Sequence, residues 1–375
     1  MPPLIPFINS SYICAMVYKV IGLMSGSSLD GLDIAYVQLE EVRGAWSYQL
    51  IHSACIPYSI EWELKLKHAA TIPVGDFLKL HASYGHYLGE QVKSFMAANN
   101  LDHKVHFIAS HGHTVFHDPQ HKTTFQLGDG ASLAAVAELP VINDLRAMDV
   151  ALGGQGAPIV PIGDKLLFGS YDYLLNIGGI ANITVLQNGE AIAFDICAAN
   201  QVLNGLAERE GKTMDEDGTI AASGALLVGV LEELNNATYY KKAAPKSLSN
   251  DDAKQIVFPL LLESDRSVAD MLHTATVHIA HQVAAAVARY PHGKDNASLL
   301  ITGGGALNGF LVSEITKALI TYNVTVTVPD EGTVQYKEAI VMALIGTLRW
   351  REETNVLSSV TGASRDSVGG AMWLG

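Results

Sequence analysis

The sequence predicts an α/β protein of two domains that share one layout. Its 375 residues exceed the size that one hydrophobic core usually serves, so two domains of ordinary size are expected. Strand-like and helix-like stretches alternate along the chain, which is typical of the α/β class. Each half also opens with a strand pair joined by a glycine-rich turn and continues with strands and helices. This recurrence indicates an internal structural repeat.

In the first half, apolar residues recur first with the period of strands and then with that of a helix. A helix is expected over 75–99 because Leu80, Tyr84 and Leu88 lie four residues apart. The predicted strands are 19–24, 32–40, 48–58, 105–110 and 141–145, and a second helix is predicted at 129–140.

The second half repeats this order. Residues 173–200 read as strand, glycine turn, strand, turn and strand. Further strands are predicted at 297–304 and 324–329, and helices at 201–210, 219–236, 265–290, 308–320 and 335–349. Residues 239–252 are polar and are predicted to form a mobile surface loop.

Charge and cysteine usage narrow the class of partner. A net charge of −14 argues against nucleic acid or an anionic membrane as a partner. The three cysteines are widely spaced and form no CxxC pair, which fits a reducing compartment and no zinc site. The first 20 residues lack a basic segment followed by a long apolar run, so neither a secretion signal nor a membrane anchor is expected. A cytoplasmic protein is therefore predicted.

Three glycine-rich turns are candidates for binding phosphate. They are SGSSLDG (25–31), NIGGIAN (176–182) and TGGGALN (302–308), each at the end of a strand or the tip of a hairpin. There the backbone can approach a ligand closely and present N–H groups to phosphate oxygens. One such turn alone would be an ordinary hairpin turn, whereas three at corresponding places favour a ligand. None is a Walker A loop or a GxGxxG fingerprint after the first strand.

Two aspartates follow strand-like runs. Asp195 ends EAIAFD and precedes small residues, so its carboxylate could face a cleft and act as a general base. The alternative is that Asp195 caps the helix that begins near Asn200. Asp30 could help to hold a metal-bound phosphate or could simply cap its turn.

The segment ASHGHTVFHD (109–118) contains three histidines, at His111, His113 and His117. We expect it to be a loop after a strand, and no carboxylates accompany the histidines in a metal-ligand pattern. A loop that contacts a sugar or another substrate is favoured over a metal site, and structural hydrogen bonding is the remaining alternative.

A second polar segment, NDLRAMDVALGGQGAP, covers 143–158. Its Arg146 could bind an anionic group through two N–H donors. Alternatively, Arg146 and Asp149 pair with each other at a hinge between the domains. Glu338 lies near the start of an apolar helix, either as a partner of the helix dipole or as an acid of the cleft.

From about residue 19 to the C-terminus the chain resembles the anhydro-N-acetylmuramic acid kinases, within the actin/hexokinase/Hsp70-like superfamily. The motifs that carry the resemblance are GLMSGSSLDGLD (22–33), SHGHTVFH (110–117), FQLGDG (125–130), NDLRAMDVALGGQGAPIVP (143–161), NIGGIANIT (176–184), ITGGGALN (301–308) and VTGA (360–363). The first loop and the GGQGAP stretch are highly specific, whereas glycine turns alone indicate only the superfamily.

The resemblance implies two duplicated ribonuclease-H-like (actin-like ATPase) domains, with ATP in the cleft between them. Residues 16–145 with about 355–375 are expected to form the N-terminal lobe, and 146–354 the C-terminal lobe. Residues 1–15 are expected to be a disordered extension. A homodimer is expected from the resemblance alone.

The resemblance also implies the chemistry. The family opens the 1,6-anhydro ring of its sugar with water and phosphorylates O6 to give N-acetylmuramic acid 6-phosphate in cell-wall recycling, using ATP and Mg²⁺. By this resemblance Asp195 is the catalytic base. The nucleotide site comprises Gly26, Ser27, Ser28, Asp30, Gly31, Gly178, Gly179, Gly303, Gly304 and Gly305. The sugar site comprises His111, Asp129, Arg146, Asp149, Asn200 and Glu338, and no metal ligands are assigned to side chains.

Three departures from the family pattern are present. Gly26-Ser27-Ser28 stands where the family has Gly-Thr-Ser, and His113 stands where it has Gln. Ile196–Ala199 replaces Thr-Gly-Pro-Gly, and alanine at a position that needs positive φ costs about 1 kcal/mol, so this turn is expected to be rebuilt. A kinase for a different amino sugar and a nucleotide-binding regulatory or chaperone-like protein of the same fold remain alternatives.

Overall fold

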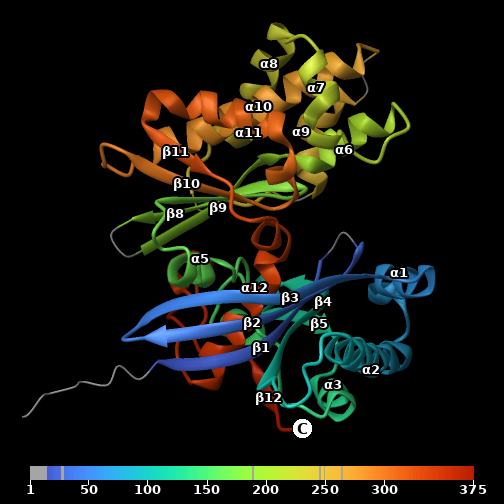
Figure 1. The fold of residues 1–375 in the computed structure, drawn as a ribbon. Helices are drawn as coiled ribbons and strands as arrows, with labels where there is room; N and C mark the ends of the chain where they lie inside the picture. The colour runs from blue at the N-terminus through green and yellow to red at the C-terminus, as the bar shows by residue number, and fades with distance from the viewer. Residues whose placement is uncertain (1–14, 27–28, 188–189, 245, 249, 263–264) are drawn as a thin grey trace, which may run out of the picture.

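The computed structural model describes residues 15–26, 29–187, 190–244, 246–248, 250–262 and 265–375, so all but Ala15 of the predicted extension lies outside the described residues. The chain forms two lobes, one above the other in Figure 1, each built on its own β-sheet. No helix among the described residues is long and apolar enough to cross a membrane.

The two sheets share one strand order over five strands, and the first sheet also contains β12 and β5. The first runs β12-β6-β4-β1-β2-β3, with β5 paired to β4, and the second runs β11-β10-β7-β8-β9. The strands of the first sheet are β1 (Met16–Ser25), β2 (Gly31–Val42), β3 (Ala45–Pro57), β4 (Phe107–Asp118), β5 (Thr123–Leu127), β6 (Val141–Asn143) and β12 (Ala371–Trp373). Those of the second are β7 (Tyr173–Ile177), β8 (Ile180–Gln187), β9 (Glu190–Ala198), β10 (Ala297–Thr302) and β11 (Val324–Thr327).

Strand direction also repeats between the sheets. In the first sheet β1 is antiparallel to β2 and parallel to β4. In the second, β7 is antiparallel to β8 and parallel to β10. The predicted duplication and the predicted fold class are therefore confirmed.

Both faces of the first sheet are buried. Along β1, Val20 belongs to one hydrophobic cluster and Ile21 to another, as the two-residue period of a strand requires. Helices α2 (Val74–Ala98) and α3 (Gly130–Ala137) cover one face, and α12 (Glu331–Trp350) covers the other. The remaining helices packed around this sheet are α1 (Ile60–Lys67), α4 (Ala147–Ala151), α5 (Pro161–Leu167) and α13 (Ser358–Thr361).

Helix α12 lies directly on the backbone of the first sheet. A side chain at Gly22 of β1 would place its Cβ 1.9 Å from the carbonyl oxygen of Ala339, and one at Gly346 would lie 2.4 Å from the Cβ of Ala109. The predicted division placed this helix with residues 146–354, but its buried apolar side chains from Ala339 to Leu348 belong to the cluster of the first sheet, and Val334 alone among those assigned to a cluster packs with the second lobe. We therefore propose that the first lobe includes α12.

The second lobe has one large core beneath its helices. The buried residues of α10 (Val268–Arg289), among them Met271, Ile279 and Val283, pack with those of β7, β8 and β9. The other helices are α6 (Asn200–Glu208), α7 (Thr219–Ser223), α8 (Val228–Asn235), α9 (Asn250–Leu261) and α11 (Gly309–Leu319). Short 3₁₀ turns in this lobe include η4 (Thr238–Lys241), η5 (Gly304–Leu307) and η6 (Ile320–Tyr322).

Several predicted elements differ from those observed. The histidine segment was predicted to be a loop, but it lies in β4, which continues to Asp118 and pairs with β5. The predicted helix at 219–236 is two helices, α7 and α8. The predicted loop at 239–252 contains η4 and the start of α9.

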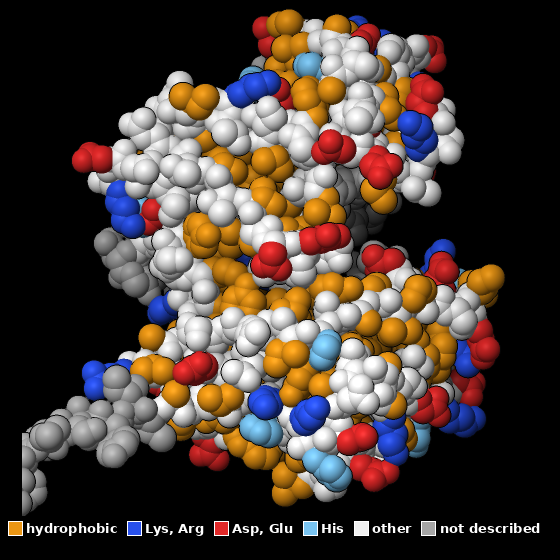
Figure 2. Space-filling view, in the orientation of Figure 1, with side chains coloured by type: hydrophobic (Ala, Val, Ile, Leu, Met, Phe, Trp, Pro, Cys, Tyr) orange, Lys and Arg blue, Asp and Glu red, His pale blue; other side chains and the backbone are white. Residues whose placement is uncertain are grey.

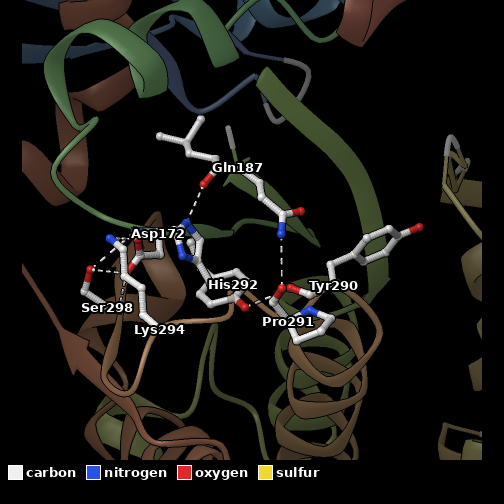
Figure 3. A network of polar contacts seen from close by, with 9 residues as sticks. Asp172, Gln187, Tyr290, Pro291, His292, Lys294 and Ser298 are labelled. Carbon is white, nitrogen blue, oxygen red and sulfur yellow. Dashed lines mark hydrogen bonds and ion pairs between the residues drawn. The ribbon is translucent and has the colours of Figure 1, made fainter. Parts of the chain in front are cut away.

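A polar network fixes the connection between α10 and β10 (Figure 3). The buried carboxylate of Asp172 accepts from Lys294 Nζ at 2.6 Å and from the Ser298 amide at 2.8 Å. His292 Nε2 lies 2.8 Å from the Leu186 carbonyl oxygen, so the connection is also attached to β8. This network attaches the loop between α10 and β10 to β8 and to Asp172, which directly precedes β7.

Candidate active site

Asp195 lies within β9 and is held from three directions. Its Oδ2 accepts a hydrogen bond from the Leu248 amide at 2.8 Å. Its own amide donates to the Lys246 carbonyl oxygen at 3.2 Å, and its carbonyl oxygen accepts from the Tyr239 hydroxyl at 2.8 Å. The capping alternative is wrong, because α6 begins after Ala199 with no side-chain cap. Asp195 is thus a strand residue whose backbone and carboxylate are both fixed.

The carboxyl group of Asp195 is half-buried. Burial raises its pKa above the ordinary value for aspartate, although the Leu248 amide and the Lys246 ammonium oppose that rise. A carboxylate with a raised pKa accepts a proton more readily, which suits a general base.

Two of the glycine turns meet at Asn200. Its Nδ2 donates to the Ile177 carbonyl oxygen at 3.1 Å, and its amide donates to the Gly178 carbonyl oxygen at 3.0 Å. A Cβ at Gly305 would lie 3.2 Å from Asn200 Oδ1, so the turn at 303–305 contacts the same side chain. Asn200 therefore joins the hairpin tip of β7 and β8 to the turn after β10.

The structural reason for glycine differs between these two turns. Gly303 has a φ of +80°, and a Cβ at Gly305 would lie 2.2 Å from Ile177 Cγ2. At Gly178 and Gly179 a Cβ would come no closer than 3.6 Å and 3.9 Å to its neighbours. Packing within the protein therefore leaves room for a side chain at 178 and 179. The space beside Gly178 and Gly179 lets a ligand approach the backbone, as the predicted phosphate turn requires.

The first glycine turn is described only in part, since Ser27 and Ser28 lie outside the described residues. Gly26 is half-buried, Asp30 is exposed, and Gly31 packs against β3, where a Cβ would lie 2.7 Å from the Ile56 carbonyl oxygen. The end of β1 is fixed by Ser25, whose Oγ lies 3.1 Å from His113 Nδ1 and 2.8 Å from the Tyr58 hydroxyl.

Asp33 is an acid of this region that the predicted site does not include. Burial raises its pKa to about 6; a hydrogen bond with the Cys55 thiol lowers it, and the charges of Asp30 and Glu338 raise it further. Asp33 thus connects the first turn with Glu338 of α12. The signal in the sequence was a carboxylate between two strand residues, Leu32 and Ile34, that face the core.

Arg146 is held between His111 and the GGQGAP segment. Its Nε donates to His111 Nε2 at 2.8 Å, and its Nη1 donates to the Gly156 carbonyl oxygen at 2.5 Å. His111 must therefore carry its proton on Nδ1, which donates to the Gly112 carbonyl oxygen at 2.8 Å. Burial and the Arg146 charge lower the pKa of His111 to about 3, so the imidazole is neutral.

Glu338 is near enough to this arginine for their charges to interact. Desolvation lowers the pKa of Arg146 to about 10. The negative charges of Glu338 and Asp149 raise this pKa and so oppose part of the shift. Burial likewise raises the pKa of Glu338, opposed by Arg146 and Lys337. Since α12 begins at Glu331, Glu338 is two turns inside the helix and not a partner of its N-terminal dipole.

Asp149 and Asp129 have structural partners. Asp149 is buried and accepts from the Gly156 amide and from the Thr361 hydroxyl, both at 2.7 Å, so the predicted pairing with Arg146 is replaced by separate partners. Asp129 caps α3 by accepting from the Ser132 amide at 2.9 Å. Both were predicted to line or support the sugar site, and Asp149 organises the segment that holds Arg146.

The predicted residues thus form two groups. One contains Asp30, Arg146, His111 and Glu338 on the first lobe, and the other contains Asp195, Asn200 and the two turns on the second. Helix α13 lies between them, because it packs against β9 while its Thr361 bonds to Asp149. Figure 2 shows the molecular surface hollowed between the lobes. Within the described ranges, no three His, Cys, Asp or Glu side chains are placed to hold a metal ion.

Comparison with known proteins identifies the family. A family model described as anhydro-N-acetylmuramic acid kinase matches residues 18–375. The chain belongs to the anhydro-N-acetylmuramic acid kinase family. A member from Francisella tularensis subsp. novicida is 32% identical over 369 residues, covering 92% of this chain and 95% of the relative. One from Shewanella sediminis is 33% identical, covering 94% and 98%.

Solved structures give a weaker likeness. The activator of the 2-hydroxyisocaproyl-CoA dehydratase from Clostridium difficile with bound ADPNP matches with a TM-score of 0.40 and 16% identity, covering 87% of this chain and 93% of that chain.

The segment in which this anhydro-N-acetylmuramic acid kinase family member departs from the family pattern is buried. Strand β9 continues through Ala198, and all four residues of Ile196–Ala199 have negative φ, so alanine is accommodated without left-handed backbone. Ile196 and Cys197 are 2% and 0% exposed and belong to the core of the second lobe. The changed side chains therefore pack behind Asp195.

Proposed function

We propose that this protein is an ATP-dependent kinase that opens 1,6-anhydro-N-acetylmuramic acid with water and phosphorylates O6, giving N-acetylmuramic acid 6-phosphate. The observation that carries the proposal is the family match over residues 18–375, which includes a half-buried Asp195 of raised pKa beside two glycine turns. We further propose that the protein is cytoplasmic and forms a homodimer, as the family resemblance implies.

In the proposed reaction Asp195 takes a proton from the attacking water. Water forms a bond to C1 of the sugar, the C1–O6 bond breaks, and O6 accepts the phosphoryl group while ADP leaves. MgATP, when bound, supplies the phosphoryl group, and its metal neutralises charge on the phosphates. The Leu248 amide holds the carboxylate in one orientation, so little reorganisation is needed for proton transfer.

The other residues would bind and orient the two substrates. The backbone N–H groups of the turns at 178–179 and 303–305 would bind the nucleotide phosphates, and Asn200 fixes one turn against the other. Arg146, held by His111 and Gly156, would bind the lactyl carboxylate of the sugar through its remaining N–H donors.

The Asp195→Asn variant tests the catalytic assignment. We expect turnover to fall at least about 10³-fold, as for loss of an essential base, while ATP still raises the melting temperature. Asp118→Asn, which removes an exposed carboxylate from a loop cap, is the matched control and should keep its activity. Near-normal turnover of Asp195→Asn would show that another residue is the base.

A kinase for a different amino sugar is the second candidate, because Ile196–Ala199 changes the packing behind Asp195. ADP release measured with 1,6-anhydro-N-acetylmuramic acid, N-acetylmuramic acid and N-acetylglucosamine separates the two. Turnover of the anhydro sugar alone supports the first candidate. Turnover of another sugar without the anhydro sugar supports the second, and ATP hydrolysis that no sugar accelerates contradicts both.

A further inference from the structure

The second lobe contains a cavity that none of the predicted site residues lines. Its volume is about 500 Å³, and it lies between α8, η4, α10, α11 and η6. A smaller cavity of about 30 Å³ adjoins it, since Tyr240, Gln282, Ala285 and Arg289 line both. The smaller cavity reaches Phe194, Ile196 and Lys246, which lie beside Asp195. The larger cavity is within the size range of small-molecule sites.

The charge of this cavity is opposite to that of the protein. The chain carries a net charge of −14, yet Lys241 and Arg289 line the larger cavity and no Asp or Glu is among the described residues that line either one. The Arg289 guanidinium donates to the carbonyl oxygens of Lys241 and Lys242, which hold it in place. Those bonds use two of its five N–H groups, and three donors remain.

One wall of the cavity is a fixed hydrogen-bond network. Asn235 Oδ1 accepts from Gln282 Nε2 at 2.8 Å and from His278 Nδ1 at 2.8 Å. His278 Nε2 lies 3.1 Å from the Tyr240 hydroxyl, which donates to it because burial lowers the pKa of His278 to about 3 and keeps the ring neutral. His281 Nδ1 lies 3.2 Å from Asn235 Nδ2 and accepts from it, so His281 Nε2 carries a proton that it can donate.

We propose that this cavity binds a small phosphomonoester of hexose-phosphate size. A phosphomonoester carries a charge of about −1.5 to −2 at neutral pH, which Lys241 and Arg289 together match. The guanidinium supplies the paired donors that suit phosphate oxygens. The rings of Tyr240 and Tyr322 provide flat surfaces for the uncharged part of the ligand, and the fixed wall needs little ordering when the ligand binds.

Occupancy of this site is coupled to Asp195 through η4, a consequence that rests on the proposed function. Within η4, Lys241 lines the large cavity, Tyr240 lines both cavities, and the hydroxyl of Tyr239 donates to the Asp195 carbonyl oxygen at 2.8 Å. A ligand that binds Lys241 and Arg289 therefore shifts η4, the turn whose Tyr239 is hydrogen-bonded to β9. The phosphomonoester is a regulator of the kinase and not its substrate.

Calorimetric titration with glucose 6-phosphate tests the site, with glucose as the uncharged comparison. The non-hydrolysable analogue ADPNP and the anhydro sugar are kept saturating so that the proposed cleft is filled. We expect glucose 6-phosphate to bind and glucose not to bind. Arg289→Gln and Lys241→Gln should each weaken binding at least 10-fold, and Ala285→Phe should abolish it by filling an exposed position shared by both cavities. Lys212→Gln, an exposed cation outside both cavities, should bind as wild type.

Wild-type affinity in both Arg289→Gln and Ala285→Phe would overturn the site, as would absence of binding to the wild-type protein. This titration needs no turnover, so it stands even if the proposed reaction is wrong. The coupling is tested separately by the kinase rate at several glucose 6-phosphate concentrations. We expect at least a twofold change in kcat/KM in the wild type and none in Lys241→Gln; an unchanged wild-type rate at saturation would overturn the coupling.

Discussion

At the scale of single residues, the carboxylate of Asp149 joins segments that are far apart in the sequence. It accepts from Gly156 in the GGQGAP segment and from Thr361 in α13. The same segment accepts a hydrogen bond from Arg146, whose Nε is bonded to His111 of β4. Asp149 is therefore a positioning residue for the arginine that we assign to the sugar.

We expect Asp149→Asn to destabilise the protein by about 2 kcal/mol, because the charged acceptor of the Gly156 amide and the Thr361 hydroxyl is lost and the hydroxyl must turn to its longer contact with the Leu357 carbonyl oxygen. The measurement is the free energy of unfolding in urea, together with KM for the sugar. Thr361→Ser keeps the hydroxyl and should lose less than about 1 kcal/mol. Equal losses in the two variants would contradict this account of the carboxylate.

The pKa of Asp195 gives a prediction for the acid limb of the pH–rate profile. A base must be deprotonated, so kcat should fall as the pH drops through a pKa that burial has raised above the ordinary aspartate value. The Lys246 charge opposes that rise. Lys246→Gln should therefore move the acid limb to higher pH, while Lys212→Gln leaves it in place. An acid limb that stays fixed or moves to lower pH in Lys246→Gln would contradict the assignment of Asp195.

Sequence patterns identified some of these residues better than others. Asp195 and Arg146 stood in specific motifs, and both are held by hydrogen bonds in the structure, while their roles stay predictions. Asp129 stood in a motif as well, but its carboxylate caps a helix. Helix caps and ligand sites use the same residue types, so a motif alone does not separate them. Asp33 was missed because a carboxylate at the end of a strand is common, and its raised pKa depends on neighbours brought close only by folding.

At the scale of elements, the contact between β1 and α12 depends on small residues on facing surfaces. Gly22 allows the helix backbone to lie against the strand, and Gly346 does the same against Ala109 of β4. This approach brings Glu338 of α12 close enough to Asp33 of β2 for their charges to interact. The position of one acid of the first-lobe group is therefore set by a glycine.

Gly22→Ala should destabilise the protein by about 3 kcal/mol or prevent folding, because the new methyl group would meet the Ala339 carbonyl oxygen, which is backbone and cannot rotate away. Gly229→Ala is the matched control, since no atom lies within 4 Å of its Cβ position in α8. It should stabilise the protein by about 0.5–1 kcal/mol. Both values come from urea unfolding, and a loss below 1 kcal/mol in Gly22→Ala would disprove the close contact.

Long elements with a clear period were predictable, and short or polar ones were not. Helix α2 was predicted within one residue of its ends because its buried positions recur every three or four residues. Strand β4 continues through histidines that resemble a loop, because its pairing with β5 overrides the local composition. Helices α1 and α9 were missed; α1 has only 8 residues, and α9 has 12 but contains Pro259.

At the scale of the whole molecule, the two lobes meet around α12. This helix covers the first sheet and also contacts β10 and η5 of the second lobe (Figure 1). Its assignment to a lobe could not be read from the order of elements, because it follows the second-lobe strands in the chain but packs on the first sheet. The lobe to which α12 belongs depends on which distant segments pack against it, and the order of elements along the chain does not contain that information.

A buried ion pair beside α12 is hydrogen-bonded to the second lobe. Lys337 Nζ lies 2.7 Å from Asp164 Oδ1 of α5, and both side chains are about 5% exposed or less. Asp164 Oδ2 accepts from the Thr184 hydroxyl of β8 at 2.7 Å, and the ammonium lies 5.2 Å from the ring centre of Phe168. One charged pair therefore connects α12, α5 and the second sheet.

Removing only one of these charges should destabilise the protein far more than removing both. Lys337→Met leaves Asp164 buried without its cation, and we expect a loss of about 3–5 kcal/mol in the free energy of unfolding. Lys337→Met combined with Asp164→Leu removes both charges, so its loss should be at least about 1.5 kcal/mol smaller than the sum for the single variants. Glu61→Gln in an exposed pair with Lys65 is the control and should cost under about 0.5 kcal/mol. If the two single losses simply add in the double variant, Lys337 and Asp164 do not act as a pair.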